Sequence, residues 1–157
     1  MAKATGWAEA ADAMNKRHPA PTATDAEWAD AIVFGTPTRF GSISSELKAY
    51  IDSLGGLWVQ GKLNGKAGAV FCSTSTTHGG NESTLLSMYN PLAHLGFIIV
   101  PTGYADASLY KAGTPYGASS VSNNQAAPPS TDDLEVARFQ GRRVTEVAKA
   151  LKHSGVK

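Results

Sequence analysis

The sequence predicts an α/β protein built on a parallel sheet, and three observations carry that prediction. Three short apolar runs, 31–35, 67–72 and 97–100, are bounded by glycine, proline or lysine and have the composition of strands buried on both faces. The first two runs end in polar loops, and a segment with helical spacing follows each loop. Strands that alternate with helices in this way imply right-handed crossovers and a parallel sheet.

The charge balance, the apolar runs and the cysteine count limit which partners and which cellular compartment we expect. The 157 residues predict one domain, and 14 basic against 13 acidic residues give no electrostatic reason to expect nucleic acid or an anionic membrane as partner. No apolar run approaches the roughly 20 residues of a membrane span, and residues 1–30 contain no signal-peptide core, so we expect a cytoplasmic protein. Cys72 is the only cysteine, which excludes an internal disulfide, and we expect it to be buried and inert.

We expect residues 1–30 to be irregular or helical, because they contain no Val, Ile, Leu or Phe. Residues 7–14 are alanine-rich and predict a short helix that ends before Pro19 and Pro21. Residues 24–27 have the composition of a second helix start.

A strand–helix core is expected over residues 31–103. Ser44 is placed to cap a helix that Gly55-Gly56 ends, which leaves Trp58 in a connection. A second helix begins at residue 81 or 82 and ends at Gly96, and Pro91 inside it predicts a kink or two helical pieces.

The last third of the chain divides into a loop and a helix. Residues 104–130 are rich in Gly, Ser, Asn and Pro without a sustained period, which predicts a long loop that is functional or contacts another subunit. Residues 131–152 predict a C-terminal helix capped at Ser130. The residues expected to face the core are Leu134, Ala137, Val144, Val147, Ala148 and Leu151.

The loops after the first two strands are the candidate binding elements, because the carboxyl ends of parallel strands meet at one edge of the sheet. Residues 38–40 and 73–80 would offer hydroxyls and backbone N–H groups to a planar polar ligand, or they are simply the Ser, Thr and Gly that such connections contain. Arg39, His78 and His94 each have an ordinary structural interpretation as surface or packed residues. Since no nucleophile elbow, carboxylate pair or P-loop is present, the chemistry is carried by a cofactor or there is none.

Four motifs resemble the WrbA-type NAD(P)H:quinone oxidoreductases, which are flavodoxin-like FMN enzymes with a three-layer αβα fold. They occur in family order between about Trp7 and Leu151. The motifs are Gly35-Thr36-Pro37-Thr38-Arg39-Phe40-Gly41, Gly55-Gly56-Leu57-Trp58, Ser73-Thr74-Ser75-Thr76-Thr77-His78-Gly79-Gly80-Asn81-Glu82 and Gly113-Thr114-Pro115-Tyr116-Gly117-Ala118.

The resemblance implies a site and a reaction. Trp58 would stack on the nicotinamide or quinone ring above the flavin, and His94 matches a family histidine at the flavin site. Hydride would pass from NAD(P)H to FMN, and the reduced flavin would give two electrons to a quinone. The family is typically a tetramer whose sites draw on more than one subunit, so we expect a homo-oligomer, dimer or tetramer. The residues implied to contact the flavin are Thr38, Arg39 and Phe40 on one side, and Ser73, Thr74, Ser75, Thr76, Thr77, His78, Gly79 and Gly80 on the other.

One part of the family pattern is missing. A flavodoxin-like sheet has the strand order 2-1-3-4-5 and holds the FMN phosphate after its first strand. If 31–35, 67–72 and 97–100 are strands three to five, residues 1–30 do not supply the first two. We therefore expect an N-terminally truncated fold with an exposed edge strand, and weakened FMN binding, because several charge-assisted hydrogen bonds of roughly 1.5–3 kcal/mol each are lost. The alternatives are a non-catalytic paralogue or fragment that associates with other subunits, and a simple ligand-binding module.

Overall fold

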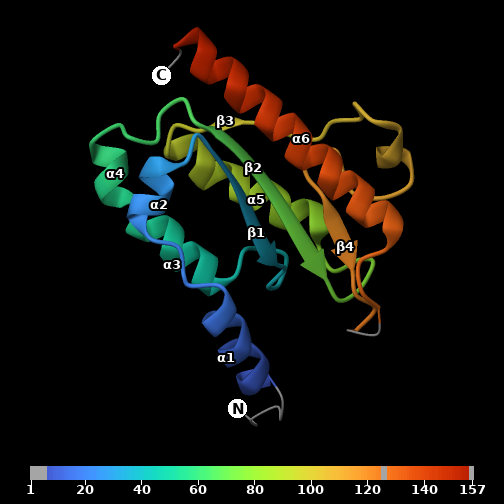
Figure 1. The fold of residues 1–157 in the computed structure, drawn as a ribbon. Helices are drawn as coiled ribbons and strands as arrows, with labels where there is room; N and C mark the ends of the chain where they lie inside the picture. The colour runs from blue at the N-terminus through green and yellow to red at the C-terminus, as the bar shows by residue number, and fades with distance from the viewer. Residues whose placement is uncertain (1–6, 125–126, 156–157) are drawn as a thin grey trace.

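The computed structural model describes residues 7–124 and 127–155 of the 157-residue chain. Figure 1 shows a parallel sheet with helices on both faces. None of the described helices has the length and apolar character needed to cross a bilayer. In chain order the elements are α1 (Trp7–Arg17), α2 (Ala23–Trp28), β1 (Ala31–Pro37), α3 (Ser45–Ser53), α4 (Gly55–Val59), β2 (Ala67–Thr74), α5 (Asn81–His94), β3 (Ile98–Ile99), the 3-10 helix η1 (Ala107–Tyr110), β4 (Ser119–Val121) and α6 (Thr131–Ser154).

Strand β2 lies at the centre of the sheet. β1 pairs with it in parallel along its length, from Ala31 opposite Ala67 to Pro37 opposite Ser73. On its other edge, β3 pairs in parallel with the start of β2 and β4 in parallel with its end. Within the described residues β1 pairs with β2 alone, so β1 forms an edge of the sheet, as the sequence predicted.

Gln140 on α6 bridges the gap between β3 and β4 on the edge of β2. Its Nε2 donates to the Val70 carbonyl at 2.8 Å, and its Oε1 accepts from the Ala118 N–H at 3.0 Å. The side chain is buried, and these two bonds replace the backbone pairing that an uninterrupted strand would make.

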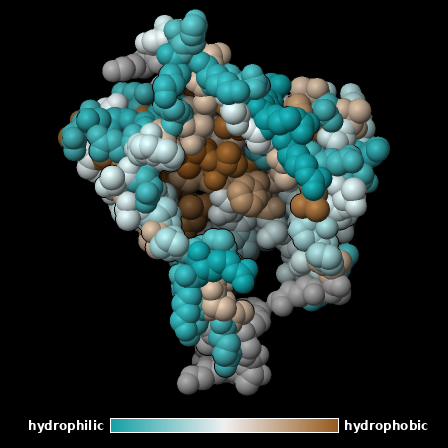
Figure 2. Space-filling model, in the orientation of Figure 1, coloured by the Kyte–Doolittle hydropathy of each residue, from teal (hydrophilic) through white to brown (hydrophobic). Residues whose placement is uncertain are grey.

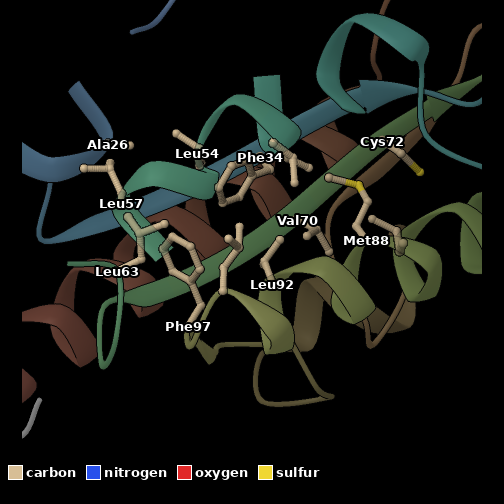
Figure 3. Packing of buried hydrophobic residues seen from close by; sticks show 13 residues of the cluster. Ala26, Phe34, Leu54, Leu57, Leu63, Val70, Cys72, Met88, Leu92 and Phe97 are labelled. Carbon is tan, nitrogen blue, oxygen red and sulfur yellow. The ribbon is translucent and has the colours of Figure 1, made fainter. Parts of the chain in front are cut away.

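The larger core lies between the sheet and helices α3, α4 and α5. Phe34 and Val70 point from β1 and β2 into this layer, where Met88 and Leu92 of α5 meet them (Figure 3). Phe34 packs edge-on against Phe97, with ring centroids 5.7 Å apart. This face of the sheet is therefore closed by apolar packing.

The opposite face carries α6 and is only partly covered. Ala67 and Ala69 of β2 are small, which lets Val144 and Ala148 of α6 pack closely against the strand. α6 does not extend over the outer part of β1 (Figure 1).

The structure corrects the long loop predicted for residues 104–130. This segment contains the 3-10 helix η1 and the strand β4. Asp106 caps the N-terminus of η1, where its carboxylate accepts a hydrogen bond from the Ser108 N–H at 2.9 Å. β4 has only three residues, two of them serines, so its pairing with β2 rather than a local pattern fixes it as a strand.

Several helix predictions need correction. Trp58 belongs to α4 and not to a connection, because Leu57 is buried and its packing outweighs the weak propensity of the two glycines before it. α5 runs as one helix through Pro91 and not as two helical pieces, with fully buried side chains on both sides of the proline. In α6, Val136 and Gln140 are buried, whereas Leu134 is exposed. Ala137 is also exposed.

Helix α2 is fixed at both ends. Thr22, rather than a residue within 24–27, is its N-cap, and it forms a capping box with Asp25. The Lys66 ammonium donates to the carbonyls of Ala26, Glu27 and Ala29 at 3.1, 2.6 and 2.5 Å, which satisfies the C-terminal end of the helix. Because Lys66 directly precedes β2, this attachment places the end of α2 beside the start of β2.

Candidate functional site

The loop after β1 is a tight, hydrogen-bonded turn. The Thr38 N–H donates to the Ser73 carbonyl at 2.8 Å, and Arg39 and Ser42 exchange backbone hydrogen bonds at 2.8 and 3.1 Å. Phe40 and Gly41 have φ angles of 53° and 76°, in the left-handed region that closes the turn. The turn leaves the Phe40 ring fully exposed beside the Arg39 side chain.

The loop after β2, residues 74–80, folds on itself in a similar way. The Thr74 hydroxyl donates to the Thr76 carbonyl at 2.9 Å, and the Gly79 N–H donates to the same carbonyl at 3.0 Å. A Cβ on Gly79 would lie 2.9 Å from the Thr74 Cβ, so the loop requires glycine there. Thr74 is buried and shapes the loop, whereas residues 75–78 are exposed.

Thr38 joins the two loops into one surface. Its hydroxyl lies 2.5 Å from the Thr84 hydroxyl of α5 and donates to the Gly79 carbonyl at 3.4 Å. A Cβ on Gly80 would lie 3.0 Å from the Gly41 Cα, so the backbones of the two loops are in contact. The structure therefore brings together the sequence-predicted residues 38–40 and 73–80 at the carboxyl ends of β1 and β2.

The segment after β4 adds a third strip to this surface. The Ser122 N–H donates to the Thr74 carbonyl at 2.8 Å, and the Asn124 N–H donates to the Ser75 carbonyl at 2.9 Å. Asn123 and Asn124 are exposed, with φ angles of 48° and 58°. These two residues were not predicted as part of the site. The adjacent asparagines were the available signal, because Asn adopts left-handed angles more readily than other non-glycine residues.

Trp58 and His94 lie together, but apart from these loops. They line a hollow of about 200 Å³ with Ile51 and Pro91, between α3, α4 and the end of α5. α5 begins next to the loop at Gly80 and ends at His94, and thirteen residue steps of helix correspond to about 20 Å. A single chain thus does not bring either side chain to the loops.

A groove links the two regions along the surface between α3 and α5. A hollow of about 650 Å³ begins at Arg39 and Phe40 and reaches Pro91, which also borders the hollow of Trp58 and His94. An extended ligand or another chain would meet both sets of residues along this path.

Cys72 lies under the loops but is not a nucleophile. Burial raises the pKa of its thiol to about 12, with Glu82 adding to the shift, and Asn81 lies within hydrogen-bonding distance of the sulfur at 3.3 Å. The protonated thiol is packed in the core, as the sequence predicted. In the part of the chain that the structure describes, no cluster of three His, Cys, Asp or Glu side chains is arranged to hold a metal ion.

A sequence model of the NADPH-dependent FMN reductase family matches residues 8–111. The chain belongs to this family. It is 49% identical over 142 residues to NAD(P)H dehydrogenase (quinone) 3 of Rhizobium meliloti (strain 1021), a match that covers 84% of this chain and 67% of that protein. A WrbA-like flavodoxin from Agrobacterium tumefaciens has a similar structure, with a TM-score of 0.66 and 28% identity over 81% of this chain and 71% of that one.

These comparisons confirm two predictions made from the sequence, the resemblance to the WrbA-type proteins and the flavodoxin-like αβα fold. The part of the chain that matches the NADPH-dependent FMN reductase family includes both loops, Trp58 and His94. β4 and α6, which complete the sheet and cover one of its faces, follow the matched residues.

Proposed function

We propose that this member of the NADPH-dependent FMN reductase family binds FMN and reduces quinones by two electrons at the expense of NAD(P)H. The observation that carries the proposal is the single surface made by residues 38–40 and 73–80, locked through the Thr38 hydroxyl. When bound there, FMN would accept a hydride from the nicotinamide and pass two electrons to the quinone.

The residues present suit the ring of FMN. The Arg39 guanidinium is exposed and offers donors in a planar fork, which complements the polar edge of a flavin. Phe40 supplies an exposed aromatic face beside it, and residues 75–78 supply hydroxyls and an imidazole for the other edge. Because Gly80 approaches Gly41 closely, backbone atoms and not side chains lie where the two loops meet.

Trp58 and His94 act, in this proposal, at the flavin of another copy. The length of α5 separates them from the loops of their own chain, whereas the groove that runs past Pro91 gives a second chain access to both regions. Trp58 is 54% exposed and would cover the flavin with its indole ring, excluding water from the reacting face. The active form is then a homo-oligomer, a dimer or a tetramer.

Arg39→Ala tests the ring-binding role. The loss of one charged hydrogen bond of about 1.5–3 kcal/mol should weaken FMN binding about 10- to 150-fold, and the free energy of unfolding of the apoprotein should stay unchanged. Arg138→Ala, on the exposed side of α6, is the control and should alter neither quantity. An equal loss of stability and FMN affinity in Arg39→Ala would instead make Arg39 a structural residue.

Trp58→Ala and a mixing experiment test the shared site. Trp58→Ala should slow NADH- or NADPH-dependent benzoquinone reduction more than it weakens FMN binding. If each site combines residues of two copies, Trp58→Ala and Arg39→Ala subunits that are mixed and allowed to exchange should recover activity. With random pairing, about a quarter of the sites join an intact Arg39 from one variant to an intact Trp58 from the other. No recovery on mixing, with turnover intact in Trp58→Ala alone, would remove Trp58 from the site.

A second candidate is a non-catalytic paralogue that binds FMN weakly or not at all and associates with other subunits. The open edge of β1 favours it, because unpaired strand edges recruit other chains. Purified protein mixed with FMN decides between the two. If no flavin absorbance stays with the protein and benzoquinone reduction equals the buffer blank, the second candidate holds.

A further inference from the structure

Residues 9–17, the part of helix α1 whose side chains the structure describes, are not buried against the rest of the chain. Residues 9–17 are all exposed, Met14 by 65%, and Figure 1 shows the helix projecting from the body of the molecule. A helix of 11 residues is marginal in water unless an apolar face packs against something. α1 therefore requires a surface on which to dock.

One side of α1 is suited to such docking. Ala11 and Met14 are three residues apart, and Ala10 lies four residues before Met14, so the three share one face of the helix. Glu9, Asp12 and Lys16 fall on the opposite side, and Ala13 lies at the flank of the face, three residues from Ala10.

An unpartnered apolar surface exists on the α6 side of the sheet. Val33, Phe71 and Leu134 are 40%, 45% and 42% exposed there, around a hollow of about 420 Å³ that Phe71 and Leu134 help to line. Phe71 folds over Gly35, where an added Cβ would lie 2.0 Å from the ring. Figure 2 shows hydrophobic side chains gathered in a hollow on this side of the molecule. We call Val33, Phe71 and Leu134 the open face.

Charges at the two surfaces are complementary. The last turn of α1 carries Lys16 and Arg17, and the first turn of α6 carries Asp132 and Asp133. Asp133 lines the same hollow as Phe71 and Leu134. A helix laid on the open face with its C-terminal turn toward the start of α6 would thus pair its basic end with an acidic one.

We propose that two copies of the chain exchange their α1 helices, each lying on the open face of the other. The linker disfavours docking within one chain. The Thr22 carbonyl is held by the Tyr50 hydroxyl at 3.2 Å, and the four residues before it include Pro19 and Pro21, span at most about 14 Å and carry α1 away from its own sheet. Reciprocal exchange closes into a two-fold dimer and covers both apolar surfaces. The proposal does not depend on FMN binding.

Light scattering of the full chain, without added flavin, tests the exchange. Ala11→Asp places a carboxylate in the docked face and should halve the particle mass, whereas Asp12→Lys, a charge change on the opposite side, should leave it unchanged. Neither variant touches the folded body, so the far-ultraviolet circular dichroism of the body should persist in both. A wild-type monomer, or equal masses for both variants, would overturn the proposal.

Disulfide trapping shows which copy supplies the helix. Chains carrying Met14→Cys should cross-link to separately prepared chains carrying Leu134→Cys after mixing and mild oxidation, giving a covalent dimer on a non-reducing gel. A chain with both substitutions that cross-links only within itself, while the mixed chains stay uncoupled, would show docking in cis and contradict exchange.

Discussion

The two faces of the sheet differ in how completely helices cover them. One face is closed by apolar packing, and the other leaves apolar side chains exposed. Helices α3, α4 and α5 close one face over a continuous apolar core, and the candidate loops, residues 38–40 and 73–80, follow the strands of that layer. Of the elements that the structure describes, only α6 covers the other face, and Val33 and Phe71 stay exposed beside it. The closed face fixes the geometry of the candidate site, and the open face leaves surface for another chain.

The largest contrast should appear in core substitutions on the two faces. Leu85→Ala, at a fully buried position of α5, should lower the free energy of unfolding by about 3–4 kcal/mol, because the closed face cannot collapse around the cavity. Val33→Ala, at a half-exposed position of the open face, should lower it by about 1 kcal/mol or less. Urea unfolding at low protein concentration measures both. Similar losses would show that the faces are equally packed.

Glycine substitutions test the fixed geometry of the loops with a smaller effect. Gly80 has a φ of 92°, and a Cβ there would press on Gly41, so Gly80→Ala should cost about 1–2 kcal/mol and weaken FMN binding. Gly141→Ala is the control: it lies within α6 with open space around it and should stabilise the protein by about 0.5–1 kcal/mol. If Gly80→Ala is neutral in both assays, the loops are more plastic than the structure indicates.

High pH should loosen the connection between the closed face and the loop before β4. The Tyr89 hydroxyl of α5 donates to the Tyr116 carbonyl, and burial, with a smaller contribution from Tyr116, raises the pKa of Tyr89 to about 12. An unfolded tyrosine ionises near pH 10, so this share of stability is complete below about pH 10 and is lost between about pH 10 and 12.

In Tyr89→Phe the unfolding free energy should therefore fall less steeply across that pH range, and the slope should change by no more than one titrating group can produce. Near neutral pH the variant should lose about 1 kcal/mol of unfolding free energy, because the hydrogen bond is absent. Chemical denaturation at a series of pH values reads out the slope. An unchanged slope would assign the alkaline loss to other groups.

The parts of the fold with a local signal could be predicted from the sequence. β1 and β2 are apolar runs that end in polar loops, and Ser44 and Ser130 cap the helices that they were expected to cap. β4 could not be predicted, because its three residues are a strand only through pairing with the end of β2.

Other errors have similar physical causes. The apolar spacing of α6 includes Leu134, but near its start the buried side chains are Val136 and Gln140. Gln140 is buried because its amide bridges β2 and the segment before β4. For the candidate site, the strand–loop pattern predicted residues 38–40 and 73–80 as neighbours, because the carboxyl ends of parallel strands meet at one edge of the sheet, and the structure confirms it. The resemblance also implied that Trp58 and His94 act at the flavin, but α5 separates them from the loops of their own chain, and no local pattern in the sequence predicted that separation.

A comparison of FMN with riboflavin tests the central claim most directly. The claim is that the closed face supplies a binding surface for the flavin ring, while no strand beyond β1 in the described chain supplies a loop for the phosphate. Each flavin is titrated with the protein, and binding is monitored by the quenching of flavin fluorescence. Both flavins should bind saturably, with dissociation constants within about threefold of each other. FMN binding more than tenfold tighter than riboflavin, or no binding of either, would contradict the account.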